Sequence, residues 1–223
     1  MSGRPLEVRK LGVVPYDRAL ALQDEFVRRR RADEIPDQLL LLEHPHVITL
    51  GSGALAEHVL ADSVRREELG ITLAHTGRGG DVTYHGPGQL VGYPILDLNP
   101  DRRDVHRYLR DLEEVLIRLL AGYGIESGRV RGKTGVWTSG GKIAAIGVRV
   151  SSGWITSHGF ALNVSTDLAY FGTIVPCGIP GEPVTSLEAI LGRPLSADEA
   201  ASRTAERFAE VFERDLHDTE DEA

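Results

Sequence analysis

The sequence contains little cysteine, no long apolar run and no excess of positive charge. With one cysteine in 223 residues, the chain can form no intrachain disulfide, and such scarcity is typical of a reducing compartment. No stretch approaches the ~18 consecutive apolar residues of a membrane span, and residues 1–10 lack the apolar run of a signal peptide. We therefore expect a cytoplasmic protein with no membrane contact.

The charge balance is acidic, with a formal net charge of −8. Nonspecific binding to nucleic acid needs a basic surface, so this balance argues against a nucleic-acid partner. The densest basic run, Arg28 to Arg31, ends a helical pattern rich in other charges. This is typical of a solvated helix end that the helix dipole favours.

The pattern of apolar residues predicts one α+β domain. A hydrophobic content of 41% is enough for a core. Strands are expected at residues 7–14, 38–43, 47–50, 71–75, 90–98, 136–138, 142–150 and 154–164. Helices are expected at residues 16–31, 62–69 and 102–123, and after capping boxes that begin at Thr185 and Ser196.

Strands and helices alternate without regular βαβ spacing, which favours a mixed, largely antiparallel sheet with helices packed on it. We expect this domain to span residues 1–214 and the acidic residues 215–223 to form a disordered tail. Asp101 is placed to cap the helix at residues 102–123, and Gly124 is placed to end it.

Cys177 is either an inert packing residue or a nucleophile. It lies in the segment Ile-Val-Pro-Cys-Gly-Ile-Pro, residues 174–180. Pro176 restricts the backbone before the cysteine, and Gly178 leaves space beside the sulfur. Free cysteine is often buried for packing alone, so the segment by itself leaves both interpretations open.

Residues 76–89 are unusually rich in glycine, with five glycines in fourteen positions. They match neither the dinucleotide-binding spacing nor the phosphate-loop pattern. Simple turns explain two of the glycines. The interleaved Arg78, His85 and Gln89 favour a loop that lines a ligand.

Lys142 and His158 are polar residues in otherwise apolar strand patterns. A lysine at the start of a strand commonly reaches water. If it is desolvated instead, it can accept a proton from a thiol or an amine. His158 and His85 are each either satisfied core histidines or site residues. No metal site is expected, because His44 and His46 flank Pro45 and no second cluster completes four ligands.

Hydrolase signatures are weak. The sequence has no G-x-S-x-G, and Ser52 in Leu-Gly-Ser-Gly falls short of it. A cysteine protease signature is also missing.

Four segments taken together resemble the octanoyltransferases of lipoate biosynthesis. They are RGGDVTYHGPGQL at residues 78–90, KIAAIG at 142–147, HGFALN at 158–163 and VPCGI at 175–179. Their order and spacing agree with that family from about residue 8 to about residue 212. The Thr-Leu-Gly-Ser segment at residues 49–52 departs from it, since similar proteins often place a basic residue after that glycine.

The resemblance implies the fold of biotin and lipoate protein ligases and the activity of a lipoyl(octanoyl) transferase. Such an enzyme moves an octanoyl group from octanoyl-acyl carrier protein to a lysine of a lipoyl domain, in 2-oxoacid dehydrogenases or the glycine cleavage H protein, and needs no cofactor. Cys177 then matches the acyl-thioester nucleophile and Lys142 the residue that activates it. The matched substrate-binding positions are Arg78, Gly79, Gly80, Asp81, Val82, Thr83, Tyr84, His85, Ala145, Ile146, Gly147, His158, Gly159 and Phe160.

Three rival functions remain at this point: an ATP-dependent lipoate or biotin ligase on the same fold, a non-catalytic binder of lipoyl domains, and a thioesterase-like cysteine hydrolase. Because acyl carrier proteins and lipoyl domains are typically acidic, docking needs a local basic surface. The candidates for it are Arg78, Arg129, Arg131, Lys133 and Arg149.

Overall fold

The computed structural model describes residues 3–175 and 181–218. The strands are β1 (Arg4–Val13), β2 (Asp37–Glu43), β3 (Val47–Leu50), β4 (Thr72–His75), β5 (Val82–His85), β6 (Gln89–Ile95), β7 (Gly135–Thr138), β8 (Gly141–Val150), β9 (Thr156–Asn163) and β10 (Arg214–Asp218). The helices are α1 (Tyr16–Arg31), α2 (Ser63–Glu68), α3 (Val105–Gly122), α4 (Leu187–Leu191) and α5 (Ala197–Phe212), with 3₁₀ turns η1 (Ala56–His58) and η2 (Leu168–Thr173).

Within the described part of the chain, the strands form two sheets. The large sheet has the order β10-β1-β2-β6-β9-β8-β7, and the small sheet has the order β4-β3-β5. In the large sheet β1 pairs in parallel with β10 and β2, and the pairs from β2 to β7 are antiparallel. The expected mixed, largely antiparallel sheet with packed helices is confirmed.

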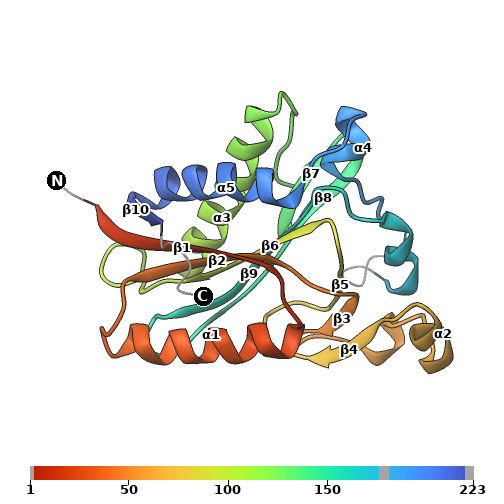
Figure 1. The fold of residues 1–223 in the computed structure, drawn as a ribbon, viewed down its shortest axis with the longest axis horizontal. Coiled ribbons are helices and arrows are strands. Elements are labelled where there is room, and N and C mark those ends of the chain that lie inside the picture. Colours follow the sequence, from red (N-terminus) through yellow and green to blue (C-terminus); the bar gives the residue numbers. More distant parts are fainter. Residues whose placement is uncertain (1–2, 176–180, 219–223) are drawn as a thin grey trace.

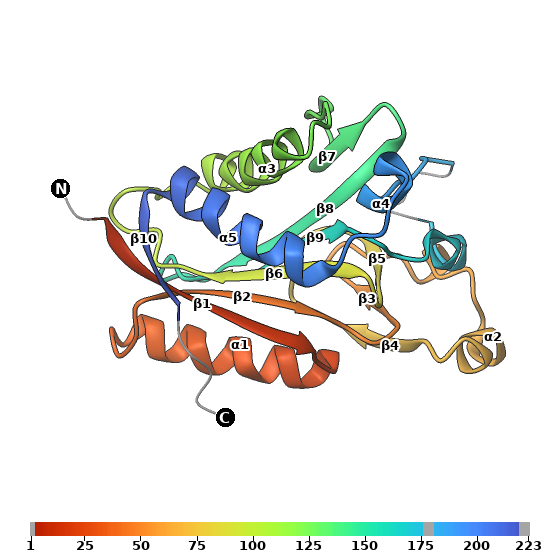
Figure 2. The same ribbon diagram turned by 45° about the horizontal axis from the view of Figure 1, so that its top comes forward.

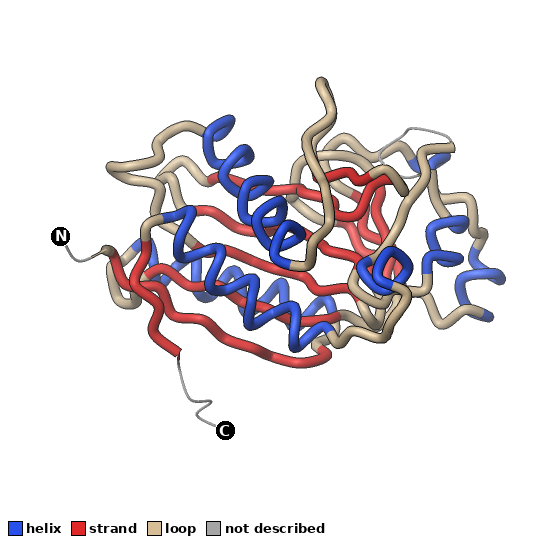
Figure 3. Tube along the Cα trace, turned by 90° about the horizontal axis from the view of Figure 1, so that it is seen from above, coloured by secondary structure: helices blue, strands red, loops and turns tan. Residues whose placement is uncertain are grey.

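Helices cover both faces of the large sheet. Figure 1 shows α1 on one face and α3 with α5 on the other, and Figure 2 shows the same layers after a 45° turn. Seen from above, helices lie over the strands of the large sheet (Figure 3). The interior strand β2 is therefore buried on both sides: Leu39 and Leu41 join the core under α3 and α5, while Leu40 and Leu42 join the core under α1. This explains its continuous apolar run.

The small sheet lies at one end of the large one, beside α2 and η2 (Figure 1). Its core contains Ile48, Leu50, Val82 and Tyr84. The strand β5 lies inside the glycine-rich segment, where the sequence suggested only a loop. Its pairing with β3 supplies the order that local composition did not predict.

Two helix starts differ from the sequence prediction. The side chain of Asp104, not Asp101, accepts hydrogen bonds from the first free N–H groups of α3, those of His106 and Arg107. Ser186, rather than Thr185, caps α4. The prediction that Ser196 caps α5 is confirmed, because its hydroxyl accepts from the Glu199 N–H.

The C-terminal strand corrects the predicted disordered tail. Residues 215–218 belong to β10, which pairs in parallel with β1. Pairing satisfies backbone groups that an isolated acidic segment would leave to water, and the sequence pattern does not show that partner. Residues 219–223 lie outside the described range.

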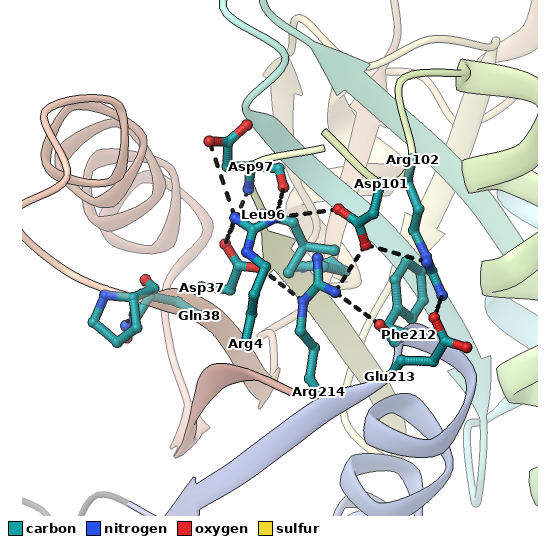
Figure 4. Close-up of polar contacts among 12 residues, drawn as sticks. Arg4, Asp37, Gln38, Leu96, Asp97, Asp101, Arg102, Phe212, Glu213 and Arg214 are labelled. Carbon is teal, nitrogen blue, oxygen red and sulfur yellow. Dashed lines mark hydrogen bonds and ion pairs between the residues drawn. The ribbon is translucent and has the colours of Figure 1, made fainter. Parts of the chain in front are cut away.

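A buried ion network joins both ends of the chain to the sheet (Figure 4). Asp37, at 1% exposure, accepts from Arg30 Nε at 2.8 Å and from Arg214 Nε at 3.0 Å. Arg214 also donates to Asp101, which explains why Asp101 is unavailable as a cap. The expectation that the whole run from Arg28 to Arg31 is solvated is therefore wrong for Arg30, which is buried.

None of the helices in residues 3–175 and 181–218 is both long and apolar enough to cross a membrane.

Candidate functional site

The described residues line a partly open cavity of about 60 Å³ between the glycine-rich segment, β8, β9 and the start of α1. We call it the pocket. Its lining residues are Tyr16, Arg78, Gly79, Gly80, Asp81, Val82, Thr83, His85, Val91, Tyr93, Ala145, Ile146, Gly147, His158, Gly159, Phe160 and Ala161.

All but one of the predicted substrate-binding residues line the pocket. The exception is Tyr84, whose ring packs against His46, Tyr170 and Phe171 in the core of the small sheet. Neighbouring side chains in a strand point to opposite faces, so Thr83 and His85 share a face that Tyr84 does not. Tyr84 therefore supports the wall of the pocket from behind.

Close backbone contacts hold the glycine-rich segment in place. The N–H groups of Ser52 and Gly53 donate to the carbonyls of Arg78 and Gly80, at 2.9 and 3.0 Å, and the Gly79 N–H donates to the Val148 carbonyl at 3.0 Å. A Cβ at Gly51 would lie 2.3 Å from the Gly80 oxygen. The segment can approach β3 this closely only because residue 51 has no side chain.

Arg78 organises this loop from inside. It is 8% exposed, and its guanidinium donates to the Thr49 carbonyl at 2.7 Å, to the Thr49 hydroxyl and to the Gly79 carbonyl. A planar guanidinium can satisfy several fixed acceptors at once, which a lysine cannot. Arg78 is consequently too buried to serve in a docking surface, and that part of the sequence prediction is wrong.

Three buried histidines surround the pocket and are neutral at physiological pH. Burial is the main cause that lowers the pKa of His44 to about 4, of His85 to about 3 and of His158 to about 4. Burial likewise raises the pKa of Tyr16 and Tyr93. These groups therefore add no charge of their own to the pocket, whose charged lining residues are Arg78 and Asp81.

A chain of hydrogen bonds fixes the tautomer of His85. The side-chain amide of Gln89 donates to the Tyr84 carbonyl and to Asn163 Oδ1, so its oxygen is the acceptor for His85 Nδ1–H at 2.7 Å. The Asn163 amide in turn donates to the Thr185 carbonyl at 3.0 Å. His85 thus keeps the lone pair on Nε2. Of the three polar residues that suggested a ligand-lining loop, Arg78 and His85 line the pocket, whereas Gln89 is not among the lining residues and holds the His85 ring.

His158 has an unusual backbone. Its φ is +56°, in the left-handed region that non-glycine residues seldom adopt. The side chain of Gln23 in α1 accepts from the His158 N–H at 2.8 Å. A strained position held by an external partner is typical of a site residue.

Lys142 lies in a second groove, beside the pocket. It is 6% exposed, and its Nζ lies 5.0 Å from the ring centroid of Trp137. This Lys142 groove shares with the pocket a common border of Gly79, Gly80, Asp81, Ile146 and Gly147. Its mouth includes the exposed residues Gly53, Gly132 and Thr134. The alternative that Lys142 simply reaches water is therefore wrong.

Cys177 lies outside the described residues. The described chain on each side of it is anchored at the site. The Val175 N–H donates to the His58 carbonyl at 2.8 Å, and the Lys142 N–H donates to the Pro183 carbonyl at 2.8 Å. His58 in turn contacts the carboxylate of Asp81 through its Nδ1.

Sequence reasoning missed several residues of the pocket wall. Tyr16, Val91, Tyr93 and Ala161 line the pocket, and His44 lies directly behind it with Nε2 accepting from the Tyr93 hydroxyl at 2.8 Å. These residues come from α1, β6, β9 and the segment after β2. Ala161 stands inside the HGFALN segment at residues 158–163, which could have indicated it. The quoted motifs give no signal for Tyr16, Val91, Tyr93 or His44, because only the fold brings their elements to the pocket.

A family model describes most of the chain. Residues 15–209 match the lipoyl protein ligase A/B catalytic domain. The octanoyltransferase of Rubrobacter xylanophilus is 56% identical over 209 residues, covering 93% of this chain and 94% of the relative. The octanoyltransferase of Geobacter metallireducens is 49% identical over 209 residues, with 94% of each chain covered.

Solved structures give the same fold. A lipoate-protein ligase A bound with ATP has a TM-score of 0.78 at 22% identity, covering 98% of this chain and 89% of its own. A biotin protein ligase from Aquifex aeolicus has a TM-score of 0.51 at 12% identity, covering 93% and 69%. The predicted relation to biotin and lipoate ligases is confirmed at the level of fold.

Proposed function

Because this chain belongs to the lipoyl protein ligase A/B catalytic family, we propose that it is an octanoyltransferase that modifies a lysine of lipoyl domains. The observation that carries this proposal is the junction of two spaces: a pocket lined by the predicted substrate-binding residues and a groove that contains Lys142. The pocket accommodates the octanoyl chain. The groove admits the carrier and then the acceptor. This division fits a reaction in which one acyl group meets two partners in turn.

In the first half-reaction Lys142 takes the proton of the Cys177 thiol, and the sulfur attacks the thioester carbonyl of the donor. The bond between the carbonyl carbon and the carrier sulfur breaks. The proton passes from Lys142 to the departing sulfur, so the carrier leaves as a thiol. Octanoyl-Cys177 remains.

In the second half-reaction the neutral amine of the acceptor lysine attacks the octanoyl-Cys177 carbonyl. The carbon–sulfur bond breaks and an amide forms. The surplus proton of the amine passes through Lys142 to the sulfur and restores the thiol. Since a thioester is already activated, conversion to the amide is downhill and needs no ATP or other cofactor.

The donor we propose is octanoyl-acyl carrier protein, and the acceptors are lipoyl domains of 2-oxoacid dehydrogenases and the glycine cleavage H protein. Among the basic residues suggested for docking, Arg129 is paired with Glu113 and Glu114, and Lys133 is paired with Glu182. Arg131 and Arg149 are exposed. These two arginines are the better candidates to meet an acidic carrier.

The experiment that tests this function is an intact-mass measurement after incubation with octanoyl-acyl carrier protein alone. We expect one octanoyl addition, located at Cys177 by peptide mapping, and its transfer to a lipoyl domain without ATP. A Cys177→Ser variant should show neither the thioester nor measurable turnover.

Other outcomes identify the rival functions. Activity that needs ATP and survives Cys177→Ser indicates a ligase on the same fold. Release of free octanoate in the presence of acceptor indicates a thioesterase. Absence of any adduct while lipoyl-domain binding persists indicates a non-catalytic binder.

A further inference from the structure

The Lys142 groove contains a carboxylate that the proposed reaction does not use. Glu182 lines the groove, and its side chain is only 7% exposed. One oxygen, Oε1, accepts from the indole N–H of Trp137 at 3.2 Å and pairs with Lys133 Nζ. The other oxygen, Oε2, is buried and has no hydrogen-bond partner among the residues that the structure describes.

A buried carboxylate oxygen without a donor is unfavourable, because it has lost water and gained nothing in return. A ligand that brings an N–H group to such an oxygen supplies the missing hydrogen bond. The other acidic residue of the groove, Asp81, is already engaged: Oδ1 accepts from the Leu55 N–H and Oδ2 contacts His58. Glu182 is therefore the groove carboxylate with an oxygen left for a ligand.

Glu182 also lies next to Lys142. The residue that follows it, Pro183, accepts a hydrogen bond from the Lys142 N–H at 2.8 Å. In addition, the two side chains contact the same indole, since Lys142 Nζ lies over the Trp137 ring while Glu182 accepts from its N–H. A cation held by Glu182 would thus be close to the group that handles protons.

We propose that Glu182 binds the ε-ammonium group of the acceptor lysine before that amine is deprotonated and acylated. This inference rests on the proposed function and extends it by naming the residue that binds the positively charged amine of the acceptor. The ammonium is the cation that this reaction must bring into the groove. The terminal torsion of a glutamate is broad, so a small rotation can turn Oε2 toward the ligand.

The test is a Glu182→Gln variant, which keeps the shape and an oxygen for Trp137 but removes the charge. The KM for a lipoyl-domain acceptor should rise about tenfold, the lower end expected when a hydrogen bond between charged groups is weakened. The rate of octanoyl-enzyme formation from the donor should not change. Reaction of the octanoyl-enzyme with hydroxylamine, which is neutral at pH 7, should also stay unchanged.

Lys133→Met is the matched control, because it removes the other member of the ion pair and leaves the carboxylate. We expect its acceptor KM to be unchanged or lower, since a competing cation is gone. If both variants raise the acceptor KM equally, the pair is only structural and the proposal is wrong. Slower octanoyl-enzyme formation in Glu182→Gln would also overturn it, by assigning Glu182 to the support of Lys142.

Failure of the proposed function has a different signature. In that case the unsubstituted protein forms no octanoyl adduct, and both assignments are withdrawn. A Glu182→Asp variant, which retains the charge, should recover part of the acceptor affinity. Recovery no better than with glutamine contradicts the role of the charge.

Discussion

Ala145 lines the pocket with the smallest possible side chain after glycine, next to Gly147 on the same strand. On the neighbouring strand β9, Phe160 and Ala161 form another part of the wall. The space that these small side chains leave free is the space that a bound acyl chain can occupy. We therefore infer that acyl chain length is decided by side-chain size at a few positions, not by polar contacts.

An Ala145→Leu variant tests this inference. Its extra carbons take space from the far part of a long chain, and each methylene excluded from an apolar site costs about 0.8 kcal/mol, or roughly fourfold in a rate constant. We expect kcat/KM for octanoyl-enzyme formation to fall about tenfold or more with an octanoyl donor, when two or more methylenes are excluded. A butanoyl donor should be affected much less. Equal losses for both donors contradict a chain-length role.

At the same residue scale, the sequence predicted which residues gather around one pocket better than it predicted how deeply each is buried. The motifs placed Gly79, Ala145 and Phe160 at one pocket, and the structure brings them there. The burial of Arg78 was not predicted, because its acceptors belong to Thr49, 29 positions away. Burial depends on what packs on a residue, and local sequence does not encode that partner.

At the level of elements, the ion network around Asp37 of β2 includes Arg4 of β1 and Arg214 of β10 (Figure 4). Arg30 of α1 also belongs to it. The carboxylate of Asp37 accepts hydrogen bonds from the guanidinium groups of Arg30 and Arg214. It also accepts a hydrogen bond from the Asp97 N–H at 3.0 Å. Removal of one partner from a buried ion pair is costly, because the remaining charge stays desolvated. The network should therefore hold the edge of the sheet together.

An Asp37→Asn variant should lower the free energy of unfolding by about 3–5 kcal/mol, as expected for a broken buried pair. Urea denaturation followed by circular dichroism measures this change. The matched control is Asp33→Asn, because Asp33 contacts the same Arg30 but is 86% exposed at its side chain. Exposed pairs contribute about 0–1 kcal/mol, so its effect should be small. Similar losses of unfolding free energy in both variants would show that the buried network contributes no more to stability than an exposed ion pair.

The prediction of helices and strands succeeded where the apolar residues follow a regular pattern. It failed where a contact with a distant segment determines the structure. The expected helix at residues 16–31 and the strand at residues 47–50 are observed with the same bounds. In contrast, β5 and β10 exist because they pair with β3 and β1. The cap of α3 moved from Asp101 to Asp104 because Arg4 and Arg214 engage Asp101. Short elements and caps are set by competition between local and distant contacts.

At the scale of the whole molecule, the pocket depends on segments that are far apart in the sequence. His44 follows β2, His85 ends β5 and His158 lies in β9, yet the rings of His44 and His85 are 5.8 Å apart. Tyr93 contacts two of these histidines. Its hydroxyl donates to His44 Nε2, and its ring lies edge-on to the ring of His158. The sequence could suggest each histidine as a candidate but could not show that they share one desolvated region.

This shared region makes the stability of the protein depend on pH in a defined window. Burial holds the pKa of His44 and His158 at about 4 and that of His85 at about 3, whereas an unfolded histidine titrates near 6.5. Below pH 6.5 the unfolded chain therefore binds more protons than the folded one. The stabilisation is complete above pH 6.5 and is lost as the pH falls toward 4.

Each of the three histidines should lower the free energy of unfolding by up to about 1.4 kcal/mol per pH unit within that window. Urea denaturation at pH 7, 6 and 5 measures the slope before most carboxylates titrate. A His44→Asn variant should have a shallower slope, because one buried base is gone. His106→Asn is the control, since His106 is exposed at the start of α3 and should leave the slope unchanged. If His44→Asn and the unsubstituted protein share one slope, the buried histidines do not set the acid limit of this fold.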